Sequence, residues 1–177
     1  MEFLTRRFRS IRRGPFAVML LAAAACAACG PQVIEGRPPF ISIASLSLVD
    51  GGLTAEFRID NQNEVAMNIE AIDITVAVND AELVGENRNL QLAIDPNSAE
   101  EIRVEERPDD LARNLLMSLE RRELNSLPFT LSGNVRTQED GYLRFEQKGH
   151  LYPVPGRPGF FRSAVTQAQE LRRDEKL

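Results

Sequence analysis

A chain of 177 residues, 43% hydrophobic and 27% charged, is long enough for one compact domain and too short for two. The formal net charge of -5 combines an arginine-rich N-terminus with an acidic remainder, because 16 Lys and Arg face 25 Asp and Glu from Cys29 onward. An acidic domain repels phosphate backbones, so we expect no nucleic-acid partner, and the absence of Trp argues mildly against an aromatic sugar-binding platform.

Residues 1–28 have the organisation of a secretory signal peptide. A basic segment with five arginines precedes an apolar run, residues 16–28, that is too short to span a bilayer as a helix. The arginine pairs in this segment are not followed by the usual twin-arginine pattern, which favours general export. The pattern predicts a leader that is removed from the mature protein.

Two cysteines follow small residues at the end of this leader, and each resembles the lipid-modified cysteine of a lipobox. Neither has the Leu that usually stands three positions upstream. We favour Cys29 as the lipidated residue, with Cys26 as the alternative, because cleavage at Cys29 leaves no spare thiol in an oxidising compartment. Residues 29–37 are then an acylated cysteine and a short tether, and the acyl chains hold the protein on a membrane.

Period-two alternation of apolar and polar residues dominates from Phe40 onward and predicts strands. The first strand, residues 40–49, changes phase near Ala44 and Ser45, which indicates a bulge. The clearest strand lies within residues 53–59, where one face is apolar and the other polar. Further strands are predicted around residues 72–78, 83–84, 90–94, 102–104, 129–135 and 143–151, with turns at residues 50–52, 61–63, 79–80, 95–98 and 139–141.

The period changes only after Pro108. Leu111, Leu115 and Leu119 recur at helical spacing with Leu116 beside them, and Asp109 and Asp110 stand at the favourable end of the helix dipole. This pattern predicts one helix, packed flat on the sheets. The proline-rich segment 153–159 is expected to end the last sheet, and residues 161–177 to form a polar tail or a surface helix.

Six or seven strands joined by short turns predict an all-β fold, an antiparallel β-sandwich with one inserted helix. The order of elements resembles the late embryogenesis abundant type 2 family, whose domain is also called the water stress and hypersensitive response (WHy) domain. The resemblance covers residues 38–160 and rests on Asn61-Gln62-Asn63 after an alternating strand, residues 69–78, Leu131-Ser132-Gly133, and residues 145–151. Family members usually have Asn-Pro-Asn where this chain has Asn61-Gln62-Asn63.

This resemblance implies an immunoglobulin-like or fibronectin III-like sandwich of about seven strands. It also implies that bacterial members are often lipoproteins and that the family is associated with protection from desiccation and water stress. The turn at Asn61 and Asn63 is expected to form without the proline, because both asparagines that supply turn hydrogen bonds are kept.

No catalytic residue, cofactor or metal site is expected, and the chain is predicted not to be an enzyme. The only histidine, His150, falls on the polar face of its strand. Asp60, Gln62 and Glu64 begin like a calcium loop, but Val65 stands where that loop needs Gly and no glutamate closes it. The carboxylate pairs Glu100-Glu101 and Glu105-Glu106 flank a strand in which neighbouring side chains point to opposite faces.

The leading functional hypothesis is therefore a membrane-anchored, non-enzymatic lipoprotein of the bacterial cell envelope. It is expected in the outer membrane, facing the periplasm, with a stress-protective or interaction role and with envelope proteins as partners. The alternative is a carrier or binding protein for an apolar ligand such as a lipid, with the leucine-rich helix as a lid.

Overall fold

The structure, a computed structural model, describes the backbone of residues 37–173 and the side chains of residues 37–166. Both candidate lipidation residues, Cys26 and Cys29, lie outside this range. Within it the chain forms eight strands and one helix: β1 (Phe40–Val49), β2 (Gly52–Asp60), β3 (Met67–Val78), β4 (Ala81–Ile94), β5 (Ala99–Glu106), α2 (Asp110–Glu120), β6 (Leu127–Thr137), β7 (Gly141–Pro153) and β8 (Phe160–Arg173). No helix in this part of the chain has the length and apolar character needed to cross a membrane.

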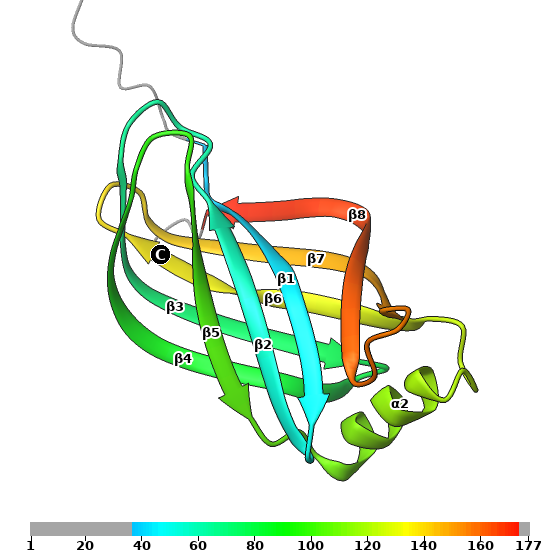
Figure 1. The fold of residues 1–177 in the computed structure, drawn as a ribbon. Helices are drawn as coiled ribbons and strands as arrows, with labels where there is room; N and C mark the ends of the chain where they lie inside the picture. Colours follow the sequence, from blue (N-terminus) through cyan, green and yellow to red (C-terminus); the bar gives the residue numbers. More distant parts are fainter. Residues whose placement is uncertain (1–36, 174–177) are drawn as a thin grey trace, which may run out of the picture. The chain divides into compact units, whose positions relative to one another are not determined.

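The eight strands of residues 37–173 belong to one antiparallel sheet with the order β4-β3-β6-β7-β8-β1-β2-β5. Figure 1 shows how this sheet doubles over on itself: β8 begins beside β1, then bends and continues beside β7. The bend places β4, β3, β6 and β7 in one layer and β1, β2 and β5 in the other. The predicted all-β class with one inserted helix is confirmed, with eight strands in place of about seven.

The core lies between the two layers and follows the alternation of the sequence. The inward positions of β2 are Leu53, Ala55, Phe57 and Ile59, all of which are at most 1% exposed. The predicted phase change in β1 is a bulge between Ile43 and Ser45 in its pairing with β2. Burial of apolar surface at about 25 cal/mol per Å² makes this interior the main source of stability.

The tight turns form where turn residues were predicted. Asp50 and Gly51 (φ 52° and 78°) join β1 to β2, and Asn79 and Asp80 (φ 45° and 66°) join β3 to β4. Two consecutive positive φ angles are the requirement of the tight hairpin turn that matches strand twist, and Asn, Asp and Gly tolerate them best.

Three expectations from the sequence were wrong. The short strands expected around residues 83–84 and 90–94 are one continuous strand, β4, because residues 85–89 pair with β3 although they are mostly polar. The segment 153–159 does not end the sheet but connects two of its strands. Most of the expected polar tail is β8, which is held by backbone pairing to β7 and β1.

The helix α2 is confirmed and covers one end of the two layers (Figure 1). The Asp109 side chain caps its N-terminus by accepting a hydrogen bond from the Ala112 N–H at 2.6 Å. The buried stripe is Ala112, Leu116 and Leu119, all fully buried, whereas Leu111 is 60% exposed. The helix is therefore packed on the sandwich along a face rotated slightly from the predicted one.

Candidate functional site

The turn between β2 and β3 is organised by a buried polar side chain. Asn61 is 1% exposed, and its amide nitrogen donates to the backbone oxygens of Val65 (2.9 Å), Ile94 (3.0 Å) and Asp95 (3.1 Å). Its side-chain oxygen accepts a hydrogen bond from the Asn63 N–H at 3.0 Å. Asn61 thereby fixes its own turn and joins it to the turn between β4 and β5.

Asn63 connects the same turn to the start of the domain. Its side-chain oxygen accepts a hydrogen bond from the Arg37 N–H, and its amide nitrogen donates to the Arg37 carbonyl at 2.7 Å. The two flanking asparagines thus have separate structural roles, while Gln62 between them is exposed. The exposed Gln62 side chain is therefore free of packing demands from the rest of the domain.

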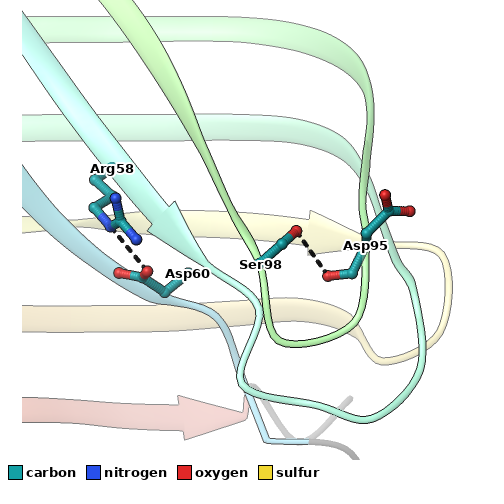
Figure 2. Close-up of polar contacts among 4 residues, drawn as sticks. All are labelled: Arg58, Asp60, Asp95 and Ser98. Atoms are coloured by element: carbon teal, nitrogen blue, oxygen red, sulfur yellow. Dashed lines mark hydrogen bonds and ion pairs between the residues drawn. The ribbon is translucent and has the colours of Figure 1, made fainter.

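Polar contacts at the ends of β2 and β4 complete this end of the domain. Figure 2 shows the Arg58 guanidinium 2.9 Å from the Asp60 carboxylate, and the Ser98 hydroxyl donating to the Asp95 backbone oxygen at 3.0 Å. Asp60, the first residue of the calcium-like pattern Asp60, Gln62 and Glu64, therefore forms an ion pair with Arg58. Among the residues with described side chains, no three His, Cys, Asp or Glu come close enough to hold a metal ion.

The remaining titratable groups singled out in the sequence are dispersed. His150 lies on the outward face of β7, with its ring centroid 6.4 Å from that of Tyr152. Glu105 pairs with Arg103, whereas the Glu106 carboxylate accepts a hydrogen bond from the Gly85 N–H at 2.9 Å, across the two edge strands β4 and β5. Glu100 and Glu101 are exposed on β5. The structure brings none of these residues together as an acid and base pair.

Two grooves lie on the outward faces of the layers. One, of about 860 Å³, runs over β1, β2 and β5, where Arg157 lies 4.1 Å above the Phe160 ring and the Ser45 hydroxyl donates to Glu56 at 2.6 Å. Of its charged side chains, Arg103 and Glu105 pair with each other, whereas Glu106 accepts a hydrogen bond from the Gly85 N–H.

The other groove, of about 770 Å³, runs over β3, β4 and β6 and adjoins a smaller hollow of about 310 Å³, with Asn89 and Arg136 lining both. Side-chain amides dominate this surface. We call the six outward residues Asn68, Asn87, Asn89, Gln91, Asn134 and Gln138 the amide face. No role was expected for these residues from the sequence, and of the four strand asparagines only Asn134 falls inside a strand that the sequence predicts.

Arg136 is the cation at the centre of the amide face. Its Nε lies 2.9 Å from the Glu70 carboxylate, and its Nη1 donates to the Tyr142 hydroxyl at 3.2 Å. The contact with Tyr142, followed by that with Glu70, raises the pKa of Arg136, so the guanidinium keeps its charge. Two partners on different strands fix the orientation of this side chain.

Gln147 is a polar side chain inside the sandwich. It occupies an inward position of β7, as its place in the alternation predicts, and is 1% exposed. Neither its amide nitrogen nor its amide oxygen has a hydrogen-bond partner in the described part of the chain. A buried amide without partners costs about 1–3 kcal/mol by mutational measures.

Comparison with known proteins adds little to this geometry. No family model matches the chain, and no curated protein does. A crystal structure of a protein from Archaeoglobus fulgidus is similar at 10% sequence identity, with a TM-score of 0.33, covering 78% of this chain and 98% of the other. A likeness at this level carries no argument about function.

Proposed function

We propose that this protein is a membrane-anchored, non-enzymatic lipoprotein of the cell envelope whose β domain protects or binds other envelope components during water stress. Acyl chains on Cys29 would provide the anchor, and residues 30–37 the tether. The domain would face the periplasm from the outer membrane. The late embryogenesis abundant type 2 (WHy) resemblance supplies the expectation of a stress role.

The observation that carries the proposal is the fixed start of the domain. Both backbone polar groups of Arg37 are held by the Asn63 amide, and Asn61 ties that turn to the β4–β5 turn. A pull on the tether would therefore be borne by the sheet through the two asparagines that the family motif keeps.

The proposal is tested by a protection assay with the full chain in detergent micelles. A labile reporter enzyme is dried with the protein, or with an equal mass of an unrelated acidic β-sandwich protein in the same detergent. We expect higher recovered reporter activity with this protein. Equal recovery in the two samples would contradict the protective role.

The carrier function is the second candidate, and Gln147 is the observation that favours it. An unpartnered amide in an apolar interior is a suitable contact for the polar end of a bound lipid. Against it, α2 is packed on the sandwich through three fully buried side chains, which opposes its use as a lid. Native mass spectrometry of the full chain tests the carrier function, which predicts a co-purifying apolar molecule.

A further inference from the structure

The amide face is unusual for the residues that build it. Asparagine is disfavoured within strands because its short side chain competes for hydrogen bonds with the local backbone. All four asparagines within the strands of residues 37–173 nevertheless lie on this one face: Asn68, Asn87, Asn89 and Asn134. Strand formation alone does not explain four disfavoured residues gathered on a single surface.

Strand register explains how these residues form a hollow surface. One row across the sheet is Asn89, Ala71, Arg136 and Tyr142, from β4, β3, β6 and β7 in turn. Ala71 is the smallest side chain of this row and stands between two longer ones, so the row is lowest at β3. In the next row, Asp73 of β3 stands between Asn87 of β4 and Asn134 of β6. The Asp73 carboxylate accepts a hydrogen bond from the Asn134 amide at 3.2 Å.

Most of the amides are free to bind. The side chains of Asn87, Asn89, Gln91 and Gln138 make no hydrogen bond within the described residues, and all four are exposed. Each offers a carbonyl acceptor and an NH₂ group with two donors. Arg136 adds donors in an orientation that Glu70 and Tyr142 already fix, so little side-chain entropy is lost on binding.

We propose that the amide face binds a neutral, hydroxyl-rich polysaccharide. Each hydroxyl of a sugar both donates and accepts a hydrogen bond, and the free amides supply both kinds of partner side by side. Tyr142 is 57% exposed at the end of the central row and offers an aromatic surface to a sugar ring. The aromatic platform that the composition argued against is thus replaced by amides and a single tyrosine.

The charges of this surface favour a neutral chain over other ligands. Glu70 forms an ion pair with Arg136, and Asp73 lines the same hollow as Arg136, so an anionic polymer would find no excess of basic residues. An apolar ligand would have to desolvate the amides without pairing them, which is costly. A polysaccharide would be the partner in the interaction role, so its binding here rests on the proposed function.

Binding is tested with the full chain in detergent micelles, so the result does not depend on protection or on membrane attachment. The probes are soluble dextran, measured by affinity electrophoresis, and purified peptidoglycan sacculi, measured by co-sedimentation. The glycan strands of the sacculi are neutral, and their carboxylates lie on the peptide stems. The test variant combines Asn89→Thr and Gln91→Thr, two exposed positions at which threonine suits a strand. The control variant combines Arg103→Thr and Glu105→Thr, an exposed pair on the outward face of the other layer.

We expect the wild-type chain to bind at least one probe, and the control variant to bind it equally well. The Asn89 and Gln91 variant should bind about ten-fold more weakly, since the carbonyl acceptor and the NH₂ donors of two side-chain amides are lost, with an unchanged melting temperature. Retention by sacculi but not by dextran would identify a cell-wall glycan as the source of the ligand, and retention by dextran would identify a general neutral glycan. Absence of binding to both probes, or equal weakening by the two variants, would overturn the inference.

Discussion

Asn61 is a buried polar residue whose side chain holds the β2–β3 turn and the end of β4 together. Its amide donates to three carbonyl oxygens and accepts from one N–H, all belonging to two neighbouring turns. Because the residue is 1% exposed, water cannot replace these bonds when the side chain is removed. The sequence predicted this turn because asparagine is common in turns. The hydrogen bonds to the Ile94 and Asp95 carbonyls could not be predicted, because these residues lie more than thirty positions away in the sequence.

Replacing Asn61 by alanine should lower the free energy of unfolding by about 1–3 kcal/mol, because the turn carbonyls lose their donor. Chemical denaturation monitored by circular dichroism measures the change. Gln62→Ala is the matched control: its side chain is exposed, so a change within about 0.5 kcal/mol is expected. Equal effects of the two substitutions would show that the buried hydrogen bonds are not what stabilises the turn.

At the scale of elements, local patterns predicted best those strands that carry their own apolar alternation. β2 and the inward positions of β7 lie where the period-two pattern placed them, including the buried Gln147. β4 and β8 were missed in part because their polar stretches are held by pairing with β3 and β7. Both pairings contain register shifts, so the strands do not follow one continuous local alternation. The amide face escaped prediction for the same reason, since it is formed by the register of three strands, β4, β3 and β6, which a local pattern does not give.

The helix provides a direct test of how α2 packs. Leu116→Ala should destabilise the domain by about 2–5 kcal/mol, because a fully buried leucine is replaced and a cavity remains. Leu111→Ala, at a position 60% exposed, should change stability little. The periodicity of the sequence placed both leucines on the packed stripe of the helix. Thermal or chemical unfolding measures the stability of each variant. A similar loss of stability in both variants would contradict the packing described for α2.

At the scale of the whole molecule, the proposed membrane attachment would depend on the acyl anchor, because the chain from Cys29 onward carries a net charge of about -9. Anionic headgroups repel such a charge. An acyl chain, by contrast, contributes about 0.8 kcal/mol for each buried methylene, and two or more chains give stable attachment that salt does not disturb. Fractionation of cells that make the protein should therefore find it in membranes, resistant to a high-salt wash.

Cys29→Ser should move the protein to the soluble fraction or leave a larger, uncleaved precursor, because serine offers no sulfur for the acyl group. Cys26→Ser is the matched control and should change neither the size nor the location of the mature protein, since Cys26 would be removed with the leader. Immunoblots of membrane and soluble fractions report both properties at once.

The opposite pattern, with Cys26→Ser releasing the protein, would assign the anchor to Cys26. Unchanged size and attachment in both variants would refute lipid anchoring at either cysteine. The same fractions also show whether attachment depends on the fold of the domain. Asn61→Ala should lower the stability of the fold while the acylated chain stays in the membrane fraction.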